Sequence, residues 1–166
     1  MKNLISLVIV VTFFSAASIV FSEGGPVLTE KSYGLVEFGS KLKEIEQRLG
    51  EKANRQTGEQ SCDFVTFTKY PGMKFMVEGG TVTRADVTAM DIPNALGIKI
   101  GTALAEVRRR FQKVVVEPHQ YDPTGHYLIF KSSDGKRAIV FEETNGKITH
   151  VRAGLEPSVE YVEGCF

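Results

Sequence analysis

The sequence has no excess of either charge, no low-complexity stretch and only one long apolar run. Lys and Arg number 20, and Asp and Glu also number 20. A balanced surface exerts no long-range attraction on nucleic acid or on an anionic membrane, so we expect neither as a partner of the mature protein. Beyond the N-terminal apolar run, no segment is long enough to span a bilayer.

The familiar catalytic motifs are also missing. There is no Gly-x-Ser-x-Gly elbow and no glycine-rich phosphate loop, since Gly79-Gly80 is only long enough for a two-residue turn. Neither cysteine has a histidine close in sequence to act as its base. The adjacent Glu142 and Glu143 would point to opposite faces of a strand. We therefore expect a protein that is not an enzyme and that uses no cofactor.

The N-terminus lacks a lipid-attachment cysteine but otherwise predicts export. A basic residue precedes an apolar run over residues 4–14, and small residues follow, which is typical of a cleaved signal peptide. Cleavage fits after Ala17 or after Ser22, and we favour Ser22 because the chain turns polar only beyond it. A retained membrane anchor is the alternative, because the apolar region reaches Phe21. We expect a signal peptide over residues 1–22 and a periplasmic or secreted protein.

Cysteine is scarce, and the pair that is present predicts a disulfide. About 144 residues remain after the signal, enough for one domain, residues 23–166, with its own hydrophobic core. Cys62 and Cys165 are an even count in an oxidising compartment. A bridge closing so long a loop stabilises a fold by roughly 4–5 kcal/mol in the chain-entropy model.

The chain contains an internal repeat. Residues 39–50 align without gaps on residues 101–112, with Gly, Leu, Glu and Arg shared. Each copy has a hydroxyl residue expected to cap a helix, Ser40 or Thr102. An amphipathic helix follows in each, with apolar residues at i, i+3 and i+7. These stripes are Leu42, Ile45 and Leu49 in one copy, and Leu104, Val107 and Phe111 in the other.

Alternating apolar runs flank both helices and are separated by turn residues. Pro-Gly, Asp-Gly and Asn-Gly pairs between such runs are typical of hairpins. The expected strands are 35–38, 63–69, 74–78 and 81–87 in one copy, and 97–100, 126–131, 137–142 and 148–153 in the other. Two strand–helix–three-strand repeats, over about 33–90 and 95–162, most economically form one antiparallel sheet with two helices on one face, an α+β fold.

The stretch Ile-x-Ile-Gly-Thr-x-x-x-Glu-Val-x-x-x-Phe at residues 98–111, duplicated in tandem and followed by antiparallel strands, resembles the β-lactamase-inhibitor-protein-like superfamily. That group also includes small lipoproteins of outer-membrane assembly. The chain departs from those lipoproteins because it lacks their lipid-attachment cysteine and carries two full units. The resemblance implies a non-catalytic binder that uses the open sheet face and hairpin loops against a partner protein.

Period-two alternation assigns strand residues to the two faces of this sheet. Val65, Phe67, Phe75, Val77, Ala85, Val87, Tyr127, Ile129, Ile139, Phe141, Val151 and Ala153 are expected to face the helices. The candidate partner-binding residues on the other face are Phe64, Met76, Arg84, Asp86, His126, Leu128, Phe130, His150 and Arg152, beside Ala138 and Val140. Tyr70 and Met73, at a hairpin tip, are expected to protrude as further contacts.

This outward set contains many adjacent apolar side chains, which a soluble monomer rarely leaves exposed. A protein partner or a second copy of the chain could cover them. The chain's own terminal segments, Pro26–Lys31 and Ser158–Phe166, could equally do so. Aromatic, Met and Arg residues beside charges are typical of binding patches.

One loop, residues 117–126, combines two histidines with an aspartate. His119, Asp122 and His126 could surround a divalent metal if the loop folded back. Their spacing matches no dedicated metal motif, so we prefer a simple turn before the following strand. The sequence thus predicts an exported soluble protein-binding module, such as an inhibitor or immunity-like protein acting on a partner enzyme. The alternatives are a metal-binding protein or metal-dependent hydrolase using this loop, and an envelope structural or assembly factor.

Overall fold

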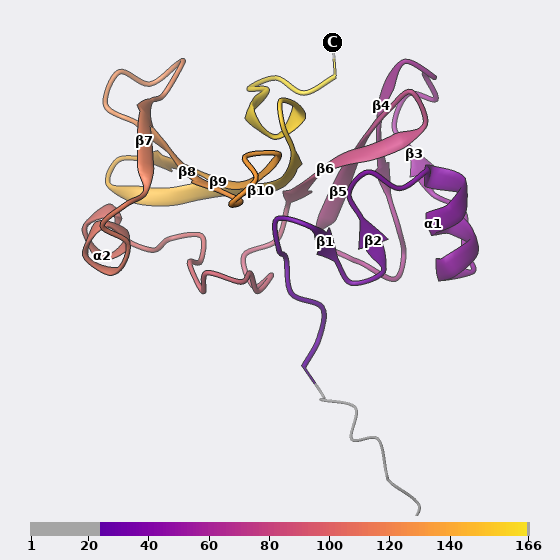
Figure 1. Ribbon diagram of the computed structural model, residues 1–166, viewed down its shortest axis with the longest axis horizontal. Helices are drawn as coiled ribbons and strands as arrows, with labels where there is room; N and C mark the ends of the chain where they lie inside the picture. Colours follow the sequence, from indigo (N-terminus) through magenta and orange to yellow (C-terminus); the bar gives the residue numbers. More distant parts are fainter. Residues whose placement is uncertain (1–23, 166) are drawn as a thin grey trace, which may run out of the picture.

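The computed structural model describes residues 24–165 (Figure 1). The predicted signal peptide, residues 1–22, and both of its cleavage positions lie outside the described residues. The elements are β1 (Ser32–Tyr33), β2 (Val36–Glu37), α1 (Leu42–Leu49), β3 (Asn54–Arg55), β4 (Cys62–Thr66), β5 (Met73–Glu78), β6 (Thr81–Val87), α2 (Leu104–Arg110), β7 (Val115–Pro118), β8 (His126–Lys131), β9 (Arg137–Thr144), β10 (Lys147–Leu155) and the 3-10 turn η1 (Ser158–Glu160). Neither α-helix among them has the length and apolar content to cross a bilayer.

One large antiparallel sheet organises the chain, in the strand order β3-β4-β5-β6-β10-β9-β8-β7. Two four-stranded meanders meet at its centre, where β6 pairs with β10 through Arg152 opposite Asp86 and Ala153 opposite Ala85. The apolar sides of both helices belong to a single core cluster on one face of this sheet. The predicted α+β class, with one large antiparallel sheet and two helices, is confirmed.

The strands at the sheet edges differ from the prediction. Residues 97–100 form no strand, and residues 36–37 pair with residues 32–33 in a separate two-stranded ribbon. The outer strands are instead β3 and β7, which follow the helices. These edge strands escaped the sequence analysis because β3 is only two residues long and β7 is a short run that ends in a proline.

Both helices are joined to the sheet by the same backbone contact. The Leu42 N–H donates to the Gly80 carbonyl over 2.9 Å, and the Leu104 N–H donates to the Gly146 carbonyl over 2.9 Å. Both acceptors lie in two-residue hairpin turns whose central residues, such as Gly79 and Asn145, have positive φ, as type I′ turns require. Each helix therefore starts at a hairpin of its own half.

The prediction that Ser40 and Thr102 cap the helices is wrong. Helical geometry begins after Lys41 and Ala103, and neither helix start has a side-chain cap bond. Thr102 Oγ1 instead accepts a hydrogen bond from the Lys99 N–H over 3.0 Å. The hairpin carbonyls take over the capping role because they satisfy the first free helical N–H groups.

The facing of β8 is the reverse of the prediction. Leu128 lies opposite Phe141, and Phe130 lies opposite Ile139, and directly paired residues share one side of a sheet. Leu128 and Phe130 therefore face the helices, while Tyr127 and Ile129 face the other way, in a separate cluster with Val140. A one-residue change of register exchanges the two faces of a strand.

The N-terminal segment and the first hairpin tip both contribute to the helix-facing core. Leu28 is fully buried and bridges to Tyr33 and Asn94. Met73 is also buried in the core, and Tyr70 is half-buried, with its hydroxyl accepting the Leu35 N–H over 2.8 Å. The prediction that Tyr70 and Met73 protrude is therefore wrong, because the turn between them folds back against the N-terminal ribbon.

Candidate functional site

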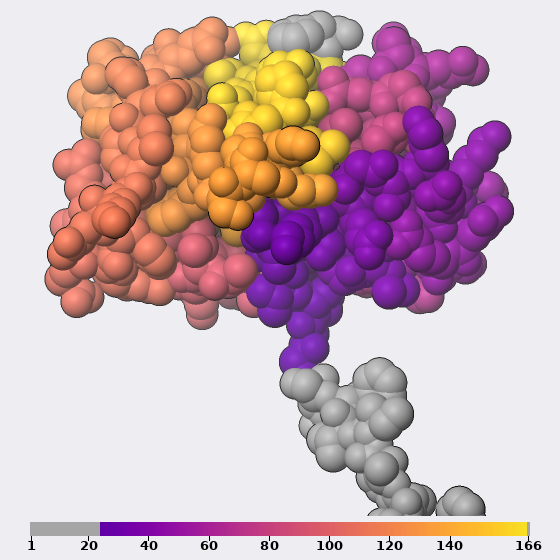
Figure 2. Space-filling model, in the orientation of Figure 1, coloured from indigo at the N-terminus to yellow at the C-terminus, as the bar shows by residue number. Residues whose placement is uncertain are grey.

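The C-terminal segment, residues 156–165, lies over the sheet face that the helices leave free, which we term the open face (Figure 1). On the surface its yellow atoms lie between those of the two meanders (Figure 2). Val159 is fully buried there against Tyr127, Ile129 and Val140. The chain's own C-terminus therefore covers the apolar part of the open face, which was one of the three expected coverings. The N-terminal residues 26–31 lie on the opposite, helix-facing side, where Leu28 joins the core.

A disulfide and two buried arginines hold this segment on the sheet. Cys62, at the start of β4, is bonded to Cys165, so the predicted bridge is confirmed. Arg84 donates through Nη1 to the carbonyls of Ser158 (3.3 Å) and Tyr161 (2.6 Å). Arg152 donates through Nε to the carbonyl of Val159 over 2.6 Å. Backbone carbonyls thereby satisfy guanidinium groups that would otherwise be costly to bury.

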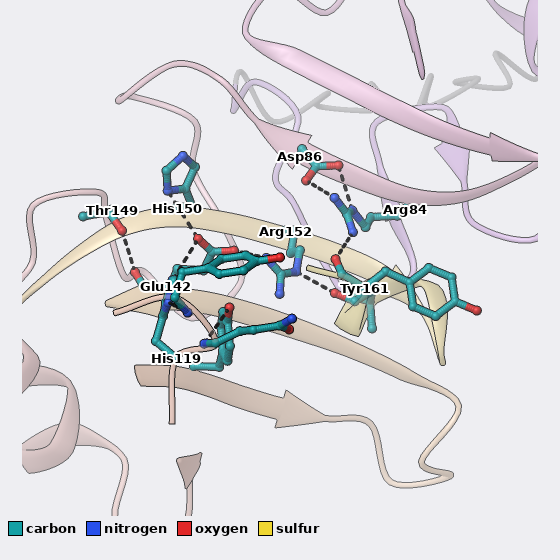
Figure 3. Close-up of polar contacts among 12 residues, drawn as sticks. Arg84, Asp86, His119, Glu142, Thr149, His150, Arg152 and Tyr161 are labelled. Atoms are coloured by element: carbon teal, nitrogen blue, oxygen red, sulfur yellow. Dashed lines mark hydrogen bonds and ion pairs between the residues drawn. The ribbon is translucent and has the colours of Figure 1, made fainter. Parts of the chain in front are cut away.

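The same arginines organise a row of charges across the centre of the sheet (Figure 3). Arg84 forms a bidentate pair with Asp86, with both N···O distances at 2.9 Å. Arg152 forms a close ion pair with Glu142 through Nη1 and Oε1. Bidentate and charge-assisted contacts of this kind fix geometry as well as adding stability, so the carboxylates at the centre of the open face are rigidly placed.

Two histidines approach the Glu142 carboxylate from different elements (Figure 3). His150 Nδ1 lies 3.5 Å from Glu142 Oε2, and His119 Nε2 lies 3.8 Å from the same oxygen. His119 stacks on the Tyr127 ring with centroids 4.7 Å apart, whereas the side chain of His150 is 69% exposed. His150 is therefore the member of this cluster that is most available to a partner.

The third histidine lies on the other side of the sheet. His126 is opposite Glu143 and shares the side of Leu128, and its Nδ1 is 2.7 Å from Glu143 Oε2. Glu143 is buried and also accepts the Gly146 N–H over 2.5 Å. The predicted outward facing of His126 is therefore wrong, for the same reason of register that applies to Leu128 and Phe130.

The 117–126 loop does not bring its three candidate metal ligands together. His119 Nδ1 accepts the N–H groups of Tyr121 and Asp122, both over 3.1 Å, while His126 pairs with Glu143 across the sheet. Asp122 accepts from both the N–H and the hydroxyl of Thr124, which lowers the pKa of its carboxyl group. Within residues 24–165, no group of three His, Cys, Asp or Glu side chains is placed to hold a metal ion.

Beside the C-terminal segment, the open face has an uncovered hollow of about 560 Å³. A second, smaller hollow of about 260 Å³ lies by Tyr127, Val140 and Arg152. The larger hollow is lined by Phe64, Lys74, Arg84, Asp86, Val87, Thr88, Ala89, Met90, Ile100, Thr149, His150 and Glu163. Lys74 Nζ lies 3.9 Å from the centroid of the half-buried Phe64 ring. Met90 is 66% exposed at the rim. The hollow therefore combines an exposed apolar residue with firmly held charges.

The predicted partner-binding residues divide between the two faces. Phe64, Met76, Arg84, Asp86, His150 and Arg152 lie on the open face, although Met76 is fully buried. Leu128, Phe130 and His126 lie on the helix-facing side. Sequence reasoning missed Glu142, although continuing the alternation of Ala138 and Val140 by two residues would have placed it on the open face.

Tyr121 and Glu163 add a contact between the 117–126 loop and the C-terminal segment. The Tyr121 hydroxyl donates to Glu163 Oε1. This hydrogen bond to the carboxylate raises the pKa of the Tyr121 phenol. The loop that the sequence offered as a metal site thus helps to hold the segment that covers the open face.

No family model matches the chain, and no curated protein matches it. Among solved structures, the chain is similar to the uncharacterised protein yfeY from Escherichia coli, with a TM-score of 0.50 and 17% identity over 77% of this chain and 99% of that one. At this identity the likeness shows the fold alone.

Two longer structures show weaker likeness. One is an extracellular protein containing an SCP domain from Bacillus anthracis, with a TM-score of 0.42 and 10% identity over 72% of this chain and 44% of that one. The other is a cysteine-rich secretory protein from Staphylococcus aureus, with a TM-score of 0.45 and 13% identity over 76% of this chain and 47% of that one. The chain spans less than half the length of either protein.

Proposed function

We propose that the mature chain is an exported protein-binding module, such as an inhibitor or immunity-like protein, that contacts its partner through the hollow on the open face. The observation that carries this proposal is the combination of exposed His150 and Met90 with Asp86, held by the buried Arg84, around the hollow beside the C-terminal segment. Exposed anchors beside preorganised charges are what binding hot spots use.

The pairing of the carboxylates favours recognition over catalysis. Asp86 is bound by Arg84, and Glu142 is bound by Arg152. A general base must bring a carboxylate oxygen within hydrogen-bond reach of a substrate proton. Both oxygens of Asp86 are occupied by Arg84, and Glu142 already contacts Arg152 and His150. These groups are better suited to presenting a fixed charge pattern to a partner surface.

Export is supported by the Cys62–Cys165 bridge, because disulfides persist mainly in oxidising compartments. We further propose that the domain consists of two tandem copies and is related to the β-lactamase-inhibitor-protein-like superfamily. Matching contacts support this view: the Gly39 N–H donates to the Val82 carbonyl over 2.8 Å, and the Gly101 N–H donates to the Ile148 carbonyl over 2.7 Å. In each half, the contact joins the glycine just before the helix to the last strand of that half, β6 or β10.

The test is a binding measurement on the oxidised mature chain. A partner would be captured by cross-linking from the exported proteins of the source organism, and its affinity would then be measured with purified components. We expect the double variant Met90→Ser/His150→Ala to bind about tenfold more weakly, a loss of about 1.4 kcal/mol. Both residues are exposed, so the variant should keep its unfolding midpoint.

The matched control is Leu35→Ser, which changes a residue that is 50% exposed between β1 and β2 and does not line the hollow. It should leave partner affinity unchanged. If Met90→Ser/His150→Ala binds as tightly as the unchanged protein, the hollow is not the contact site. If no exported protein binds the mature chain at all, the module proposal fails.

A further inference from the structure

The helix-facing side of the sheet contains an apolar groove of about 580 Å³ next to α2. Leu96, Phe111, Val114, Phe130 and Ile139 form its apolar walls. The groove lies on the opposite side of the sheet from the hollow, since Phe130 and Ile139 both face the helices. It is therefore a separate surface from the proposed partner site.

The groove exists because α2 covers its half of the sheet less completely than α1 does. All three stripe residues of α1 are buried, but α2 buries only Val107. Leu104 and Phe111, at the positions that match Leu42 and Leu49, are only partly buried. Since α2 ends at Arg110, the space beyond it along the sheet has no helical cover.

One wall of the groove continues into an unpaired sheet edge. Strand β7 is the last strand of the sheet, so its outer side has no neighbour. The His119 N–H points towards β8 and donates to the Gly125 carbonyl over 3.0 Å. Backbone groups alternate along a strand, so the N–H and C=O groups of residues 114 and 116 point outward, away from β8. Pro118, which has no N–H, ends this open edge, as prolines on edge strands do.

This edge lacks the protection that the opposite edge has. Val115 is 46% exposed and Val116 is 36% exposed. The opposite edge strand, β3, is only two residues long and consists of Asn54 and Arg55. Proteins usually blunt edge strands by shortness or charge because an open edge invites another strand. The first half follows this rule, whereas the second half presents apolar residues and free backbone groups together.

The groove has basic residues in its lining. Lys113 and Lys131 lie there with one acidic residue, Glu30. Lys131 is already paired with Glu156 and Glu160, so Lys113 is the basic residue left to face a ligand. A segment that carries an acidic residue beside its apolar one would match this distribution.

We propose that an extended peptide segment of a partner protein adds to the outer edge of β7 as a further strand. Its backbone would pair with the outward groups of residues 114 and 116, a large apolar side chain would enter the groove beside the contacting Phe111 and Phe130 rings, and a neighbouring acidic residue would face Lys113. Strand addition takes affinity from main-chain hydrogen bonds and specificity from such pockets. This goes beyond the hollow on the open face and does not depend on it.

The test uses a displayed library of random linear 12-residue peptides, selected on the oxidised mature chain. Enriched peptides should share one Phe, Leu, Ile or Met with alternating β-branched residues and an adjacent Asp or Glu. Synthetic copies, measured by fluorescence anisotropy, should bind at least tenfold more weakly to Val116→Pro, which removes an outward N–H but no bond to β8. Val116→Thr, the matched control, keeps that N–H and should bind within about twofold of the unchanged chain.

A second variant, and tests for two alternative ligands of the groove, complete the experiment. Leu96→Trp, which fills the groove, should also weaken peptide binding at least tenfold, while Met90→Ser/His150→Ala should not change it. That last variant separates this proposal from the proposed function. Failure to enrich any such peptide overturns the proposal, as does equal binding to Val116→Pro and Val116→Thr. If the chain forms a dimer that Val116→Pro dissociates, the occupant of the site is a second copy instead. If the chain binds laurate and this variant leaves that binding unchanged, the occupant is a lipid instead.

Discussion

The two halves of the domain have the same order of helix and strands, but their helices cover the sheet to different extents. In both, a helix begins at a hairpin carbonyl and a four-stranded meander follows. In the first half α1 is followed by Gly50, whose left-handed backbone lets its N–H close the last turn. In the second half α2 is followed by Phe111, whose φ is −130°. The second helix is shorter, and the sheet beside it stays partly uncovered.

This difference shows which parts of such a fold are free to form binding surfaces. Leu42, Ile45 and Leu49 of α1 are all buried, so a change of volume there costs stability. The second half instead carries the groove, the open edge of β7 and all three histidines. The three predictions below test whether the first half stabilises the fold while the second half leaves surfaces free.

The largest effect is expected from the bridge that ties the two halves together. Cys62 lies in the first meander, and Cys165 ends the segment over the second, at a sequence separation of 103. Replacing both with Ser should lower the free energy of unfolding by about 4–5 kcal/mol, because the unfolded chain gains loop entropy. Urea unfolding at neutral pH measures this difference. A loss below about 1 kcal/mol would show that the arginine contacts alone hold the C-terminal segment.

The next effect compares equivalent helix positions in the two halves. Leu49→Ala removes a buried side chain and should cost about 3 kcal/mol. Phe111→Ala removes a larger but half-buried ring beside the groove and should cost only about 1.5 kcal/mol, because part of its surface already contacts water. Urea unfolding of both variants measures the difference. If Phe111→Ala costs as much as Leu49→Ala, the groove is closed in solution.

The third effect, smaller than that of Leu49→Ala, concerns Asp63, a buried carboxylate beside the disulfide. It accepts the N–H groups of Thr57 and Gly58 at 2.9 Å each and pairs with Arg55 at 3.1 Å. Burial alone would raise the pKa of Asp63, but these donors outweigh it and hold the pKa well below the ordinary value. Asp63→Asn should therefore lower the free energy of unfolding by about 2 kcal/mol at neutral pH.

The pH dependence of this loss has a definite sign. A carboxyl group with a lower pKa in the folded state stabilises the fold above its ordinary pKa, and it stops doing so as the pH falls towards the folded value. The gap between the unchanged chain and Asp63→Asn should therefore shrink between pH 5 and pH 2 in urea unfolding. A gap that stays constant over this range would mean that the carboxylate charge does not contribute.

Sequence patterns were sufficient wherever one residue type or one period dominated. The turns at Gly79-Gly80 and Asn145-Gly146 follow from residues that tolerate positive φ. The buried stripe of α1 follows from helical periodicity. The disulfide follows from there being two cysteines. In these cases neighbours in sequence carry the whole signal.

The same patterns failed on β8 because both of its faces are apolar. Residues 127–130 read Tyr-Leu-Ile-Phe, so alternation does not say which pair faces the helices. Pairing with β9 settles the matter by placing Leu128 opposite Phe141. The other face then needs a cover of its own, which Val159 supplies. The errors at His126, Leu128 and Phe130 therefore have one cause: the sequence does not reveal how β8 pairs with β9.

The candidate surfaces depend still more on contacts between distant segments. Arg84 and Ser158 are far apart in the chain, as are Glu142 and His119, and no local pattern links the members of either pair. The groove likewise depends on how far α2 reaches along the sheet.

Local sequence patterns are enough to specify the turns, helices, disulfide and α+β class of this chain. They also predict its export signal. Which face the C-terminal segment covers, and which surfaces remain open, follow only from the register and packing of the folded chain. Turn and helix preferences act between residues a few positions apart, whereas a surface exists only once distant strands are paired.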